Sequence, residues 1–128
     1  MDAQPDTSSA DPDVPNFAVT GEQVGAVSVI SVAGAVDMLT APRLAQEIRS
    51  ALAMKPSAVI VDLTAVDFLA SAGMQVIVAA HEDAGSGVRL VVAADGPATS
   101  RPLKITGIAD FIDVFDTRGN ALEAVQAC

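Results

Sequence analysis

The sequence predicts an α/β domain with a mixed, mostly parallel β-sheet of about five strands covered by α-helices. Two observations lead to this fold class. Short apolar segments typical of strands alternate with longer amphipathic segments typical of helices, in the order β-β-α-β-α-β-α-β-α. This alternation implies parallel strands joined by crossover helices, with one antiparallel pair at the beginning. In addition, 51% of the 128 residues are hydrophobic, which is enough for one buried core.

The beginning of the chain differs from the rest. Residues 1–15 contain three prolines, four aspartates and no basic residue. Such a segment buries little apolar surface and its charges repel one another, so we expect a disordered acidic tail at 1–15 and one domain over 16–128. Between Asn16 and Gly34, two strands joined near Gly21–Gly25 are expected, because apolar and polar side chains alternate in the second of them.

The middle of the chain carries signals for two helices around a central strand. Thr40 is a suitable N-cap for the first helix, and Pro56 marks its end. The apolar segment Ala58–Leu63 is typical of a strand that is covered on both faces. A second, largely buried helix is expected from Ser71, its predicted N-cap, to Gly85, its predicted C′ residue. A strand, a short helix, a strand and a terminal helix are expected at 88–94, 98–108, 111–115 and 117–127.

Charge and composition limit the partners and the location. The formal net charge of −9 argues against binding to nucleic acid or to an anionic membrane surface, whereas a basic protein surface is compatible with it. No apolar segment reaches the ~18–20 residues that span a bilayer, and the first residues do not resemble a signal peptide. The one cysteine, Cys128, cannot form a disulfide within the chain. We therefore expect a cytoplasmic protein.

Catalytic patterns are missing from the sequence. There is no Walker A motif and no set of zinc ligands, and the sole histidine, His81, falls inside the predicted buried helix, where a structural role is expected. Asp62, at the predicted end of the central strand, is a candidate aspartyl-phosphate acceptor, but the paired acids and the lysine that this chemistry needs are absent. Asp62 is instead expected to accept backbone hydrogen bonds in a turn. We expect no enzyme activity and no cofactor.

Ser71 allows two interpretations. As an N-cap, its hydroxyl would accept a hydrogen bond from a backbone amide and contribute ~1 kcal/mol to stability. The same position favours a phosphate, because free amides and the positive end of the helix dipole attract negative charge. The small neighbours Ala70, Ala72 and Gly73 would leave the hydroxyl accessible to another protein. The residues alone leave both interpretations open.

Two motifs carry a resemblance to a known family. "VIVDLTAVDFLASAGMQVI", residues 59–77, is similar to the signature of the STAS domain of bacterial anti-sigma factor antagonists. "SVAGAVDMLTAPRL", residues 31–44, is similar to the family's glycine–x–x–aspartate turn before the first long helix, and "RPLKITGIADFIDVF", residues 101–115, to its later helix and last strand. The element order matches from Phe17 to Val125, and the resemblance is greatest to actinobacterial members.

The resemblance implies a STAS fold and a switchable partner. Members of the family bind an anti-sigma factor, often a GHKL-type serine kinase, and thereby free an alternative sigma factor. The kinase phosphorylates the first hydroxyl of the motif, which here is Ser71, and the modified antagonist is released; a serine phosphatase restores binding. The residues that match the partner-facing surface are Asp37, Ala70, Ser71, Ala72, Gly73 and Met74.

The chain departs from the family pattern beside the phosphoacceptor. Ala70 stands where an aspartate is usual, and Ala72 replaces a second serine or threonine. Loss of the acid changes what a kinase recognises, and loss of the second hydroxyl removes a reserve acceptor. The alternative function is a STAS scaffold or sensory module that binds a nucleotide or small ligand, with Ser71 serving only as a helix cap.

Overall fold

The computed structural model describes residues 10–11 and 14–126. Cys128 and residues 1–9 and 12–13 of the predicted tail lie outside the described residues. Strand β1 (Ala10–Asp11) pairs with strand β2, which begins at Val14, so paired strands precede residue 16, the predicted start of the domain.

The predicted α/β class and the mostly parallel sheet are confirmed. The sheet has six strands in the order of the sequence, and β1 is the strand that the sequence did not predict. The β1–β2 and β2–β3 pairs are antiparallel, and the other three pairs are parallel. The strands are β1, β2 (Val14–Val24), β3 (Val27–Val36), β4 (Ala58–Leu69), β5 (Arg89–Ala93) and β6 (Val114–Phe115). The helices are α1 (Ala41–Ala53), α2 (Ser71–Ala84), α3 (Ser100–Ile105), the 3-10 helix η1 (Ile108–Asp110) and α4 (Arg118–Gln126).

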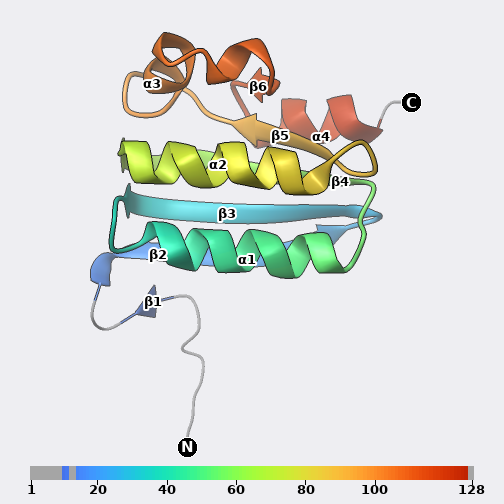
Figure 1. The fold of residues 1–128 in the computed structure, drawn as a ribbon, viewed down its shortest axis with the longest axis horizontal. Helices are drawn as coiled ribbons and strands as arrows, with labels where there is room; N and C mark the ends of the chain where they lie inside the picture. Colours follow the sequence, from blue (N-terminus) through green and yellow to red (C-terminus); the bar gives the residue numbers. More distant parts are fainter. Residues whose placement is uncertain (1–9, 12–13, 127–128) are drawn as a thin grey trace, which may run out of the picture.

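The helices form a layer on each face of the sheet. α1 and α2 run along the strands on one face (Figure 1), where α3 and η1 join them in the larger core cluster. Ile30, Val61 and Val92 point from the strands into this layer, and Ile77 of α2 packs against them. The opposite face is covered by α4, whose Ala121 is buried in a smaller apolar cluster. Because the strands alternate their side chains, one sheet supplies both cores.

Strand β4 is six residues longer than predicted. It runs to Leu69 because the register with β3 shifts twice, once between Ser31 and Ala33 and once between Gly34 and Ala35. These irregularities accommodate extra residues in β4, so polar Thr64 and Asp67 are exposed while the pairing continues. Asp62 consequently lies inside the strand, and the prediction that it ends the strand is wrong.

The last strand is shorter than predicted. Only Val114–Phe115 of the expected segment 111–115 pairs with β5. Gly107 adopts a left-handed conformation, with φ of 85°, and the chain then forms η1 instead of entering a strand. Ile112 is buried in the larger core although it lies in the turn before β6 and not in a strand. Among the residues described, no helix has both the length and the apolar character to cross a membrane.

Candidate functional site

The candidate site lies where the two central strands end. β3 and β4 are parallel neighbours, with Val36 opposite Leu69, and the Ala70 amide donates a hydrogen bond to the Val36 carbonyl oxygen over 2.9 Å. The β3–α1 loop and the start of α2 are therefore adjacent, at the left-hand end of the sheet in Figure 1. The fold brings together Asp37 and Ser71, which lie 34 positions apart in the sequence.

The β3–α1 loop is closed by hydrogen bonds between two of its side chains and the backbone. Asp37 Oδ1 accepts the amides of Leu39, at 2.9 Å, and Thr40, at 3.2 Å. Thr40 Oγ1 accepts the Asp37 amide at 2.9 Å and donates to the Ala35 carbonyl at 2.8 Å. Thr40 is the N-cap of α1, as predicted, but its hydroxyl closes the loop rather than capping the helix. Asp37 thus has a structural role in this loop.

Ser71 is the first residue of α2 and not its N-cap. The N-cap is Ala70, which has the extended backbone usual at this position, with φ of −84° and ψ of 169°, but whose methyl side chain has no oxygen to accept a hydrogen bond. The prediction that Ser71 caps the helix is therefore wrong. The Ser71 side chain is exposed, and within residues 10–11 and 14–126 its hydroxyl forms no hydrogen bond. The hydroxyl is thus accessible, and a capping role does not account for it.

Gly73 lies on the inner side of α2. A Cβ at this position would lie 2.5 Å from Val36 Cγ1 and 2.8 Å from Leu69 Cδ1, closer than real Cβ contacts. The absence of a side chain lets α2 approach the two central strands. Gly73 is one of the six residues predicted to face a partner, but it is buried. It therefore positions α2 against the sheet and offers no surface for a partner to contact. Ser71 is exposed, and the others are partly buried: Asp37, Ala70, Ala72 and Met74.

Three large apolar side chains near these loops were missed in the sequence-based prediction of the site. Met38 and Leu39 are 80% and 74% exposed in the β3–α1 loop, and Phe68 is 54% exposed near the end of β4. Phe68 pairs with Ala35, one residue before the Val36–Leu69 pair, so it belongs to the same end of the sheet. The sequence does contain a signal for two of them, because Met38 and Leu39 are apolar residues in a predicted turn, directly before the predicted N-cap Thr40. We call Asp37, Met38, Leu39, Phe68 and Ser71 the strand-end surface.

The other residues considered for chemistry have structural roles. Asp62 is buried, and its Oδ1 accepts the Thr64 amide at 3.0 Å and the Thr64 hydroxyl at 2.7 Å. His81 is partly buried, and its ring lies 5.5 Å from that of Phe111, which links α2 to the segment after η1. In the described part of the chain no three histidine, cysteine or acidic side chains are placed to hold a metal ion.

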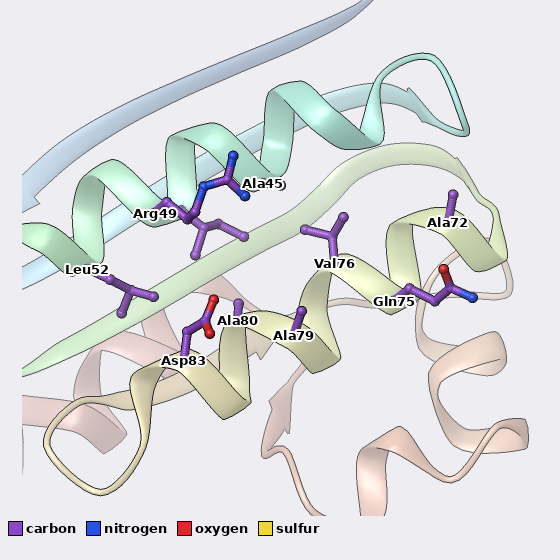
Figure 2. A pocket seen from close by; sticks show the side chains of 10 residues that line it. Ala45, Arg49, Leu52, Ala72, Gln75, Val76, Ala79, Ala80 and Asp83 are labelled. Carbon is purple, nitrogen blue, oxygen red and sulfur yellow. The ribbon is translucent and has the colours of Figure 1, made fainter.

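Two grooves flank the exposed side of α2. The first, of about 190 Å³, separates α2 from α1 (Figure 2). Leu52 and Asp83 lie at one end of it, and Ala72 and Gln75 lie at the end nearer Ser71. The second, of about 390 Å³, separates α2 from the end of α3 and from η1, and Ser71 itself lines it. The strand-end surface is therefore continuous with a groove along α2.

The family is shown by a match to the STAS domain model over residues 18–121. The chain belongs to the STAS domain family. It is also 34% identical over 111 residues to the anti-sigma-F factor antagonist RsfB of Mycobacterium tuberculosis, a match that covers 87% of this chain and 91% of that protein.

Solved structures show the same fold. An anti-sigma factor antagonist from Mycobacterium paratuberculosis superposes with a TM-score of 0.84 at 39% identity, over 91% of this chain and 98% of that one. SpoIIAA in its unphosphorylated form gives a TM-score of 0.73 at 16% identity, over 87% of this chain and 98% of that one. Bacillus SpoIIAA in the phosphorylated form gives a TM-score of 0.65 at 17% identity, over 84% of this chain and 99% of that one. These results confirm the predicted STAS fold.

Proposed function

We propose that this protein is an anti-sigma factor antagonist, which binds an anti-sigma factor in the cytoplasm and so frees an alternative sigma factor. The observation that carries the proposal is similarity along nearly the whole domain to proteins with this role, RsfB and the Mycobacterium paratuberculosis antagonist. The protein acts by binding, without catalysis or a cofactor.

The strand-end surface is the proposed contact with the anti-sigma factor. Met38, Leu39 and Phe68 expose large apolar side chains at one end of the sheet, and exposed apolar side chains that lie near one another mark interaction sites. Such side chains stabilise an interface when a partner removes their apolar area from water, by ~25 cal/mol per Å². The net charge of −9 favours a partner whose surface is basic.

Ser71 is the proposed phosphoacceptor, modified by the anti-sigma factor acting as a GHKL-type serine kinase and restored by a serine phosphatase. Its hydroxyl is exposed, and helical geometry leaves the amides of Ser71 and Ala72 without partners inside the helix. The first turn of α2 contains no acidic side chain, so a phosphate would meet no carboxylate from its own helix. Ala70 and Ala72 leave Ser71 as the one hydroxyl at this turn.

The switch would act at the interface. A phosphate adds a charge of ~−1.5 to −2, which must lose its water if a partner is to cover it. An unpaired buried charge costs several kcal/mol, and about 1.4 kcal/mol already changes affinity tenfold. The match to SpoIIAA in both its unphosphorylated and its phosphorylated form supports a fold that persists through modification.

The second candidate is a STAS module that senses a nucleotide or another small ligand. The observation in its favour is the 390 Å³ groove beside α2, because ligand sites have volumes of ~300–1,000 Å³. A thermal shift with ATP or GTP in the absence of any protein partner would support this candidate, whereas the antagonist is expected to show none.

The test is a binding titration of the full chain with purified anti-sigma factor. Wild-type protein and Ser71→Ala are expected to bind alike, because the exposed hydroxyl makes no contact that alanine would lose. Ser71→Asp and protein phosphorylated by the kinase with ATP are expected to bind at least ~10-fold more weakly. Mass spectrometry should place the phosphate on Ser71 and find none in Ser71→Ala. Absence of binding by the unmodified wild type would refute the antagonist function.

A further inference from the structure

The groove between α2 and the α3–η1 segment begins at Ser71 and is apolar along most of its length. Met74 and Val78 of α2 form one wall, and Thr106 and Ile108 form the other. Thr106 Oγ1 lies 3.8 Å from Met74 Sδ, so the two walls are in contact near the Ser71 end. Ile105, which precedes Thr106, is 75% exposed. The groove therefore offers an apolar channel along the helix.

The two ends of this groove differ in charge. Of the described residues that line it, Glu82 is the one with an ionisable side chain. Glu82 is exposed and, within the described part of the chain, forms no ion pair. It follows Ser71 by eleven positions in the same helix, which corresponds to ~16 Å along the axis. The groove thus has a hydroxyl at one end and an unpaired carboxylate at the other.

We propose that this groove receives an amphipathic α-helix of the anti-sigma factor, about three turns long, with a basic side chain over Glu82. The inference rests on the proposed function and adds the form of the partner to it. Three turns match the ~16 Å between Ser71 and Glu82. A helix docks in such a groove through apolar residues spaced three and four apart. The walls are α2 on one side and the end of α3 with η1 on the other, so neither offers a strand edge to which an extended peptide could add as a further strand.

Charge complementarity fixes the direction of the partner helix. Its basic end lies over Glu82, so its other, uncharged or acidic end lies at Ser71. A phosphate on Ser71 then faces no cation at that end and must be desolvated against the partner. The same helix placed in the opposite direction would bring its basic end to the phosphate, and phosphorylation would strengthen binding. The proposed direction is thus the one that lets phosphorylation release the partner.

The test compares variants on the groove with matched variants beside it, in full-length protein titrated with purified anti-sigma factor. Glu82→Lys is expected to weaken binding ~10-fold or more relative to Asp83→Lys, which makes the same change of charge but lies on the α1 side of α2. The difference should shrink at high salt, where exposed charges are screened. A Lys→Glu or Arg→Glu substitution in the partner helix should restore binding to Glu82→Lys.

A second pair tests the shape of the groove. Ala79→Arg places a long side chain on the exposed ridge between this groove and the one beside α1, and Ala53→Arg makes the same change on exposed helix surface outside both. Binding should fall ~10-fold or more for Ala79→Arg and by less than ~2-fold for Ala53→Arg. Both alanines are exposed, and circular dichroism melting checks that each variant is folded.

The outcomes separate this inference from the function on which it rests. If wild-type protein binds the anti-sigma factor while Glu82→Lys and Ala79→Arg bind like their controls, the groove is not the docking site and only the helix proposal falls. If wild-type protein does not bind, the antagonist function and the helix proposal fall together. A thermal shift with ATP or GTP that Ala79→Arg abolishes would assign the groove to a small ligand and overturn the helix proposal.

Discussion

At the scale of single residues, Gly73 allows the candidate site to form because it has no Cβ. Its replacement by alanine would place a methyl group 2.5 Å from Val36 Cγ1 and 2.8 Å from Leu69 Cδ1. Both neighbours are buried core side chains that have little room to move. Gly73→Ala is therefore expected to lower the free energy of unfolding by ~1–3 kcal/mol, measured by urea denaturation.

Gly87→Ala is the matched control for this substitution. A Cβ added at Gly87 would meet no atom within 4 Å, and the backbone there is not left-handed. Alanine at this position should be neutral or add up to ~1 kcal/mol, because it restricts the unfolded chain. Equal stabilities for Gly73→Ala and Gly87→Ala would show that α2 can shift away from the sheet without cost, which would contradict a required close approach at Gly73.

Ser71 and Gly73 show what the sequence could and could not predict about the candidate site. The resemblance of residues 59–77 to a known motif selected both, but a motif match does not distinguish an exposed hydroxyl from a buried glycine. The position at which α2 begins decides which of the two is exposed, and α2 begins after the extended backbone of Ala70. Alanine is not a typical N-cap residue, so the sequence does not predict this start. Met38, Leu39 and Phe68 were missed because apolar residues are normally taken as core, and their exposure depends on where the strands end.

At the scale of elements, the β3–α1 loop depends on the Asp37 carboxyl oxygen as an acceptor. Asp37→Ala leaves the amides of Leu39 and Thr40 without their bonds to Oδ1 and is expected to cost ~1 kcal/mol in the free energy of unfolding. Asp37→Asn keeps an oxygen at this position and should stay within ~0.5 kcal/mol of wild type. Thermal or urea unfolding of the two variants measures the difference.

Asp95 provides the control for the Asp37 variants. Asp95 is exposed, and within the described residues its side chain forms no hydrogen bond, so Asp95→Ala and Asp95→Asn should have nearly equal stability. If Asp37→Ala and Asp37→Asn also match each other, the carboxyl oxygen does not hold the loop. The comparison separates the structural role of Asp37 from any role of its charge in partner binding, because the asparagine removes only the charge.

The elements that the sequence placed best are those with strong local signals. α2 ends at Ala84, and Gly85, predicted as its C′ residue, is its C-cap with φ of 60°, which glycine adopts without steric cost. The ends of β4 and β6 were misplaced because they depend on pairing with a neighbour: β4 continues through two irregularities opposite β3, and β6 keeps only the two residues that reach β5. Register between strands is not encoded in either segment alone.

At the scale of the whole molecule, the sheet separates α1 and α2, which begin at the candidate site, from the layer formed by α4. α4 packs through Ala121 and Leu122 on the face opposite α1 and α2. Arg118 also forms an ion pair of 2.8 Å with Glu22 of β2. Both side chains are partly exposed, so the pair contributes ~0–1 kcal/mol to the free energy of unfolding. The attachment of α4 thus depends mainly on apolar packing, at a distance in the fold from the strand-end surface.

This separation predicts opposite effects for the same substitution at two leucines. Leu122→Ala removes packing between α4 and the sheet and should lower the free energy of unfolding by ~1–3 kcal/mol, while the affinity for the anti-sigma factor stays within ~2-fold. Leu39→Ala removes an exposed side chain and should change stability by less than ~0.5 kcal/mol. It should weaken binding ~10-fold, because a partner docked on the strand-end surface would bury the leucine. Urea unfolding and calorimetric titration of both variants, at a temperature where each is folded, measure the two effects. If both variants lose affinity equally, the partner contacts both faces of the sheet, and the strand-end surface is not the main site of binding.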